Sequence, residues 1–115
     1  MGAKPIKTSW YYILLSLAAA DRHGLAVARE VLSLSDGRLR LWPAMLYGAL
    51  ADLCERGWIE ELTDPRRRPS DESERKRYYR ITRAGRRAAA AETERLAGLV
   101  RVARSRVRPR TGETS

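Results

Sequence analysis

The sequence predicts a mainly helical fold with a small β-hairpin and a long C-terminal helix. Two observations predict it. Apolar residues recur at helical spacing in four separate segments, and two β-prone segments with a charged stretch between them precede the last of these helices. The chain has 115 residues, which is the usual size of one domain. We therefore expect a single domain that contains these elements.

The first two helices are expected before residue 36. The first runs from Ser9 to about residue 20, with Thr8 or Ser9 available as its N-cap. Its apolar face consists of four residues: Trp10, Ile13, Leu14 and Leu17. Turn-forming residues at 21–24 end this pattern. The second helix is expected from Leu25 to about residue 35, where a helical period resumes. Its apolar residues are Leu25, Ala28, Val31, Leu32 and Leu34.

A short strand and the third helix are expected next. Residues 38–41 alternate arginine and leucine, which predicts a half-buried strand with Leu39 and Leu41 facing inward. Pro43 can occupy the first turn of a helix, because its missing N–H would have no partner there. The third helix follows this proline and ends where Gly57 can form a left-handed cap. Its core residues are three leucines: Leu46, Leu50 and Leu53.

A hairpin and the fourth helix are expected in the second half of the chain. Segments 58–62 and 77–81 are β-prone, and residues 63–76 between them are mostly polar or charged. This pattern predicts a hairpin with a long flexible tip. Thr82 can cap a fourth helix over 83–106, a segment rich in alanine, arginine and leucine that would be about 36 Å long.

Composition excludes several classes of protein. The longest apolar runs fall far short of the roughly 20 residues that cross a bilayer, and the N-terminus lacks the apolar stretch of a secretory signal. One cysteine and one histidine cannot form an internal disulfide or a zinc site, and no catalytic triad or glycine-rich phosphate loop is present. We therefore expect a cytoplasmic protein that is not an enzyme and binds no metal and no cofactor. We expect His23 to be a structural cap and Cys54 to be an inert apolar side chain.

The net charge of +9 indicates a nucleic-acid partner. Arginine supplies 20 of the 23 basic side chains, and residues 58–115 carry 16 basic against 9 acidic side chains. Guanidinium groups bind phosphate in a bidentate fork and are less strongly hydrated than ammonium groups. The excess therefore favours nucleic-acid binding, with a solvated basic face as the alternative.

Three helices, a short strand and a hairpin with a charged tip are together the elements of a winged helix-turn-helix fold. The third helix would enter the major groove of double-stranded DNA, while the hairpin, or wing, would reach phosphates or the minor groove. The residues predicted at this interface are Arg38, Arg40, Pro43, Ala44, Met45, Tyr47, Gly48, Arg66, Arg67, Arg68, Lys76 and Arg77. Ala44, Met45 and Gly48 can contact thymine methyl groups but offer little hydrogen-bond readout. Tyr47 has two open interpretations, a hydroxyl that faces a phosphate or a half-buried ring.

Four blocks of the sequence resemble a known family. They are Tyr11-Tyr12-Ile13-Leu14, then His23-Gly24, then Leu46-Tyr47-Gly48-Ala49-Leu50 through Gly57-Trp58-Ile59, and finally Arg77-Tyr78-Tyr79-Arg80-Ile81-Thr82-Arg83-Ala84-Gly85. In these blocks the chain resembles the PadR-like transcriptional regulators in their short, single-domain form, over roughly residues 8–106. The resemblance implies a dimeric winged-helix repressor whose C-terminal helix pairs two subunits. It also implies a possible effector, since some members bind small aromatic or drug-like molecules.

The chain departs from the family pattern in three places. Leu25 follows His23-Gly24 where many members have tyrosine. Ala44 and Met45 stand where the family commonly has a glycine and a small hydroxyl residue, so the hydroxyl group that would bind phosphate is missing or displaced. No aromatic residue follows Tyr79, so an effector site would have to use aromatic residues of the first helix. The candidates there are Trp10, Tyr11 and Tyr12.

The predicted function is that of a sequence-specific DNA-binding transcriptional regulator, a homodimeric repressor on an inverted-repeat operator. Either an effector or a partner would release it from the DNA. Residues 5–82 would form the DNA-binding domain, 83–107 the dimerisation helix and 108–115 a disordered tail. The apolar stripe of the fourth helix is too weak to hold alone, so we expect a second copy to pair with it. The pairing residues would be Leu96, Leu99, Val100 and Ala103. The alternatives are a winged-helix protein-interaction adaptor and a non-specific nucleic-acid binder.

Overall fold

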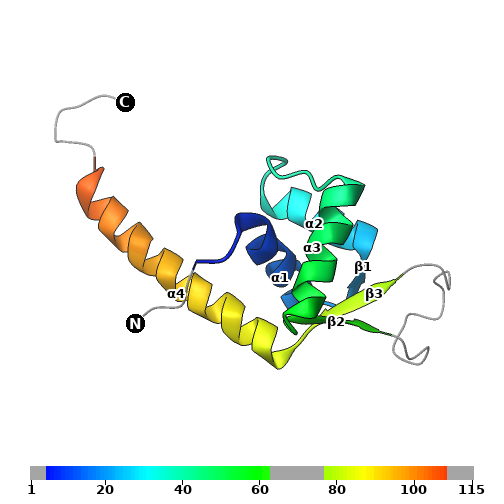
Figure 1. The fold of residues 1–115 in the computed structure, drawn as a ribbon. Helices are drawn as coiled ribbons and strands as arrows, with labels where there is room; N and C mark the ends of the chain where they lie inside the picture. Colours follow the sequence, from blue (N-terminus) through cyan, green and yellow to red (C-terminus); the bar gives the residue numbers. More distant parts are fainter. Residues whose placement is uncertain (1–4, 63–76, 109–115) are drawn as a thin grey trace.

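The computed structural model describes residues 5–62 and 77–108. In chain order its elements are α1 (Thr8–Ala19), β1 (Arg22–His23), α2 (Gly24–Leu34), α3 (Pro43–Glu55), β2 (Ile59–Leu62), β3 (Tyr78–Ile81) and α4 (Arg83–Arg106) (Figure 1). The predicted fold class, mainly helical with a small antiparallel sheet and a long last helix, is confirmed. The predicted hairpin tip at 63–76 lies outside the described residues, as does all of the predicted tail except Arg108.

The core lies where α1, α2 and α3 meet the sheet. The predicted inner faces of the first and third helices are confirmed, because each of their apolar residues is at least nine-tenths buried. The largest fully buried side chains are Ile13, Leu14, Leu17, Val27, Val31, Leu46, Leu50, Leu53, Ile59 and Leu62. In the described ranges, no helix is long and apolar enough to cross a membrane.

The sheet has three antiparallel strands in the order β1-β3-β2. The prediction of a strand at 38–41 is wrong, since these residues adopt no strand and the third strand is β1, which was expected to be a turn. A strand requires a neighbour to pair with, and residues 38–41 pair with none of the three strands β1, β3 and β2. The alternation at 38–41 reflects burial instead: Leu41 is 6% exposed and Leu39 packs against the core, while Arg38 and Arg40 face solvent.

The start of α1 and the apolar pattern of α2 also differ from expectation. The helix α1 begins at Thr8, so its N-cap is Lys7, which makes no side-chain capping bond. In α2 the buried face consists of Gly24, Val27 and Val31, whereas Leu25 is 51% exposed. Helical spacing alone does not show which of two neighbouring rows of apolar residues on α2 faces the core. The contacts of α2 with α1 and α3 determine which row is buried.

The expected glycine cap of α3 is confirmed and sets the position of the sheet. Gly57 has a φ of +77°, a left-handed value that favours glycine. Its N–H donates to the Cys54 carbonyl at 2.9 Å, and the next N–H, of Trp58, donates to the Leu53 carbonyl at 3.1 Å. These two bonds form a Schellman motif, which ends α3 and turns the chain directly into β2.

Thr82 caps α4, as predicted. Its hydroxyl oxygen accepts from the Gly85 N–H at 3.0 Å and donates to the Gly57 carbonyl at 2.6 Å, which ties the start of α4 to the end of α3. The residues of α4 that are buried in the chain lie in its first half: Gly85, Ala89 and Glu92. Beyond Glu92 every described residue of α4 is at least partly exposed, and Figure 1 shows this half leaving the three-helix body.

Candidate nucleic-acid interface

The exposed face of α3 gathers the predicted interface residues of that helix. Pro43, Ala44, Met45, Tyr47 and Gly48 are all exposed. By helical spacing Ala44 and Gly48 lie opposite the buried leucines and Met45 and Tyr47 flank them, while Pro43 is exposed where the helix begins. Pro43 is the first residue of the helix, where its missing N–H leaves no hydrogen bond unmade. The third helix therefore packs one side against the core and leaves the other side exposed to solvent.

The segment before α3 places two cations and a tryptophan beside this face. Arg38 and Arg40 are exposed, and the guanidinium carbon of Arg40 lies 5.4 Å from the ring centroid of Trp42. Trp42 is the N-cap residue of α3 and is 62% exposed. Sequence reasoning missed Trp42. The available signal was a tryptophan directly before a helix-starting proline, within an arginine-bearing segment.

Tyr47 packs against the start of α2. A Cβ atom at Gly24 would lie 2.9 Å from the Tyr47 hydroxyl oxygen, so the tyrosine ring occupies the space that a side chain at residue 24 would need. The side chain remains 44% exposed. Tyr47 thus fixes the packing of α3 on α2 with one side of its ring and leaves the other side open to solvent.

Of the predicted wing cations, the structure describes Arg77. It is exposed and directly precedes β3, at the base of the wing. The other predicted wing residues lie outside the described ranges: Arg66, Arg67, Arg68 and Lys76. The described part of the predicted interface therefore consists of the exposed residues of α3, Arg38, Arg40 and Arg77.

The two predicted effector residues face different cavities. Trp10 lines a cavity of about 340 Å³ together with Trp58 and Arg56. The two indoles meet edge to face at 6.1 Å, and the Arg56 guanidinium carbon lies 4.9 Å from the Trp10 centroid and 5.3 Å from that of Trp58. Tyr11 lines a second cavity of about 410 Å³ between α1, Leu34 and α4. The structure therefore does not bring Trp10 and Tyr11 into one sandwich.

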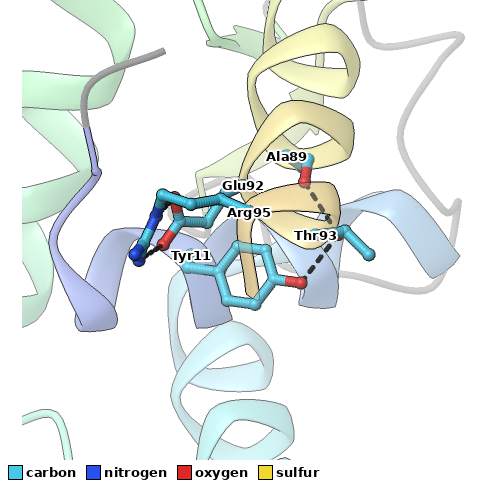
Figure 2. A network of polar contacts seen from close by, with 5 residues as sticks. All are labelled: Tyr11, Ala89, Glu92, Thr93 and Arg95. Carbon is cyan, nitrogen blue, oxygen red and sulfur yellow. Dashed lines mark hydrogen bonds and ion pairs between the residues drawn. The ribbon is translucent and has the colours of Figure 1, made fainter. Parts of the chain in front are cut away.

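A polar network joins α1 to α4 (Figure 2). The hydroxyls of Tyr11 and Thr93 are 2.7 Å apart, and Thr93 also donates to the Ala89 carbonyl at 2.8 Å. Because the Thr93 hydroxyl has one proton and uses it on that carbonyl, Tyr11 is the donor to Thr93. Close by, Arg95 forms two hydrogen bonds to the Glu92 carboxylate, at 2.8 and 2.6 Å. The Tyr11–Thr93 bond therefore joins α1 to the middle of α4, whereas the Arg95–Glu92 pair lies within α4.

Glu92 is 6% exposed and ionised. The hydrogen bonds from Arg95, with the charge of that guanidinium and a backbone hydrogen bond from Ile6, hold the pKa of the Glu92 carboxyl below its ordinary value, against the opposing effect of burial. A lowered folded-state pKa means that the carboxylate stabilises the folded chain above the ordinary glutamate pKa of about 4.3. This contribution is lost as the pH falls through the folded-state value.

Glu92→Gln should therefore lower the melting temperature at pH 7 and flatten its decline between about pH 5 and pH 2. Thermal unfolding followed by circular dichroism across this range measures both effects. Glu94→Gln is the matched control, because Glu94 is an exposed residue of the same helix. Identical pH profiles for Glu92→Gln and the wild type would show that this carboxylate does not hold α4.

His23 and Cys54 have structural positions. The Nδ1 atom of His23 accepts from the Ala26 N–H at 3.2 Å and caps α2, as predicted, while its ring meets Tyr78 edge to face at 5.5 Å. Burial, with the charges of Glu61 and Glu60, raises the pKa of the Cys54 thiol above its ordinary value. A raised pKa favours the unreactive protonated thiol.

The predicted pairing residues lie on the half of α4 that leaves the body. Leu99 is 56% exposed and Val100 is 46% exposed, and Ala103 is also exposed. Leu96 is partly buried, because it lines the cavity beside Tyr11. Three of the four predicted pairing residues are therefore exposed in the single chain.

The model of the PadR-like family of transcriptional regulators matches residues 13–91 of this chain. The chain belongs to this family. The match begins inside α1 and ends in the first half of α4, so it covers the three-helix body, the sheet and the α4 cap. No curated protein matches the sequence. The family is one of transcriptional regulators, which are generally not enzymes.

Solved structures share the fold of this PadR-like regulator. A transcriptional regulator from Clostridium thermocellum is 23% identical, with a TM-score of 0.70 over 90% of this chain and 99% of its own. A PadR family transcription regulator from Clostridium difficile is 17% identical, with a TM-score of 0.70 over 86% and 97% of the two chains. RosR of H. salinarum is 22% identical, with a TM-score of 0.60 over 94% and 84%. At these identities the likeness establishes the winged-helix fold.

Proposed function

We propose that this PadR-like regulator is a homodimeric, sequence-specific repressor that binds an inverted-repeat operator in the cytoplasm and has no catalytic activity. One observation carries the proposal: the N-terminal half of α3 is exposed opposite its buried leucines, and Arg38 and Arg40 stand exposed directly before it. This arrangement suits a helix that enters the major groove while the neighbouring arginines hold the phosphate backbone.

The proposed roles follow the order of the chain. Residues 5–82 bind DNA through the α3 face, Arg38, Arg40 and the wing cations, which are Arg66, Arg67, Arg68, Lys76 and Arg77. Residues 83–107 pair two copies, and 108–115 form a disordered tail. Pairing places two copies of α3 in successive major grooves, about 34 Å apart, so that the bound dimer blocks access of polymerase to the DNA.

A small aromatic effector, if one regulates this protein, would bind in the Trp10 cavity. Tyr11 is a poorer candidate, because its hydroxyl is already bonded to Thr93. Lys7 and Arg56 both place cations over the Trp10 ring, at 5.0 and 4.9 Å. Glu92 also lines this cavity, but its carboxylate is paired with Arg95, so the two cations favour an aromatic carboxylate over a neutral ring. Saturable quenching of tryptophan emission by aromatic carboxylates would support this site, and its absence would remove the effector from the proposal.

Removing Arg38 and Arg40, the two exposed arginines before α3, tests the proposed DNA-binding face. Arg38→Ala with Arg40→Ala should weaken binding to specific and scrambled duplexes alike. It should also flatten the dependence of log K on log salt by about 0.9 unit for each phosphate that an arginine no longer neutralises, or roughly four units per dimer. Fluorescence anisotropy at several salt concentrations measures the slope. Arg83→Ala with Arg87→Ala, which removes the same charge from α4, is the control. A slope that changes equally in both variants would contradict the assignment of this face.

Selection of duplexes from a random pool by the full-length protein tests the sequence preference and the symmetry. The proposal predicts enriched inverted repeats, bound by two chains per duplex. The adaptor alternative predicts no enrichment, and the non-specific alternative predicts tight binding without enrichment.

A further inference from the structure

The exposed face of α3 has almost no hydrogen-bond donors. Its side chains that face solvent belong to Pro43, Ala44, Met45, Tyr47, Gly48, Ala51, Asp52 and Glu55. In the major groove, guanine is read by arginine or lysine and adenine by asparagine or glutamine. None of these four residue types occurs anywhere in α3. Tyr47 supplies one hydroxyl, and the ring that carries it packs against α2 at Gly24.

The N-terminal end of α3 instead carries an apolar tip, which we define as Trp42, Ala44 and Met45. Trp42 is 62% exposed and Met45 is 50% exposed. Two large apolar side chains exposed three residues apart give this end of α3 an apolar surface that a partner can cover. Arg40 lies over the Trp42 ring, and Arg38 is exposed nearby, so the surroundings of the tip are cationic. This charge favours a polyanion as the partner.

The other end of the same face is acidic. Asp52 and Glu55 are exposed in the last turn and a half of α3. Their charges repel a phosphate backbone, so the face approaches DNA with its N-terminal end, where the apolar tip lies. The one apolar group on a base edge in the major groove is the C5 methyl group of thymine.

We infer that the apolar tip of α3 reads thymines through their C5 methyl groups, in place of the hydrogen-bond readout that α3 lacks. The inference rests on the proposed function and names the bases that its specificity requires. Each methyl group removed from water contributes about fourfold in affinity. The preferred duplex should therefore hold thymines at one or two positions of each half-site where α3 enters the groove.

Uracil substitution tests the inference on the duplex enriched by selection. Deoxyuridine pairs as thymidine does but lacks the C5 methyl group, so replacing one thymine at a time isolates the methyl group's effect. With the full-length wild type, anisotropy should show a loss of about fourfold at one or two positions per half-site and no loss at the other thymines. Met45→Ala should abolish the loss at one of these positions, and Met45→Leu should retain it.

Controls separate methyl recognition from a general effect of mutation. Leu34→Ala shortens another apolar side chain, which is 45% exposed at the end of α2, and should keep the wild-type discrimination between thymine and uracil. An enriched sequence that binds equally well with thymine and with uracil at every position would overturn the inference and leave the proposed function intact. Discrimination that survives in both Met45→Ala and Trp42→Ala would also overturn it. A selection without any enriched sequence would refute the proposed function and the inference together.

Discussion

Leu99→Glu is expected to prevent dimerisation and to lower the affinity of the protein for an inverted-repeat duplex by about 100-fold or more. Leu99 is 56% exposed in the single chain, so a carboxylate there costs the monomer little, but a carboxylate buried between two copies of α4 would be unpaired. Linking two binding modules raises the overall affinity by about 10² to 10⁴, and a monomer loses this gain. Sedimentation velocity measures the mass, and anisotropy measures the affinity.

Ser105→Glu is the control for the added charge, because Ser105 is an exposed residue of the same helix on another face. It should stay dimeric and keep most of the affinity. If Leu99→Glu sediments and binds as the wild type does, the C-terminal half of α4 is not the pairing surface.

Gly85→Ala is expected to destabilise the fold by about 1 to 3 kcal/mol, even though alanine favours helices over glycine by about 1 kcal/mol. A Cβ atom at residue 85 would overlap the Trp58 carbonyl oxygen and lie 2.9 Å from Ile81 Cγ1. That carbonyl is backbone and already accepts the Thr82 N–H at 3.0 Å, so it cannot swing aside. The start of α4 must instead move away from the sheet. Urea unfolding measures the decrease in stability.

Gly98→Ala is the matched control in the same helix. A Cβ atom there would meet only the end of the Arg101 side chain, at 3.8 Å. This variant should be neutral or more stable by up to about 1 kcal/mol. If Gly85→Ala and Gly98→Ala both stabilise the protein, the contact between α4 and the Trp58 carbonyl does not determine the position of the helix.

Local patterns predicted the helices and their ends well. The buried leucines of α3 follow from helical spacing, and Gly57 and Thr82 follow from the chemistry of caps, because these features depend on residues close together in the chain. The alternation at 38–41 misled for the same reason. It identified which side chains are buried but not whether a strand partner was available.

The parts of the site that depend on distant contacts could not be predicted. The packing of Tyr47 on Gly24 and the bond between Tyr11 and Thr93 join residues 23 and 82 positions apart, and no local pattern records them. The assignment of Trp10 and Tyr11 to separate cavities depends on the angle of α4. Trp42 was missed because apolar residues are normally assigned to the core, and its exposure became evident only once the chain path before α3 was known.

Competition anisotropy on the most enriched duplex tests the central claim most directly. The full-length protein would be titrated against this duplex and against a scrambled duplex of the same composition, with excess competitor DNA at about 0.15 M salt. We predict a preference of about 10³ or more for the enriched duplex, with saturation at two chains per duplex. Equal affinity for the two duplexes would contradict the account, because it would mean that the positive charge alone supplies the binding.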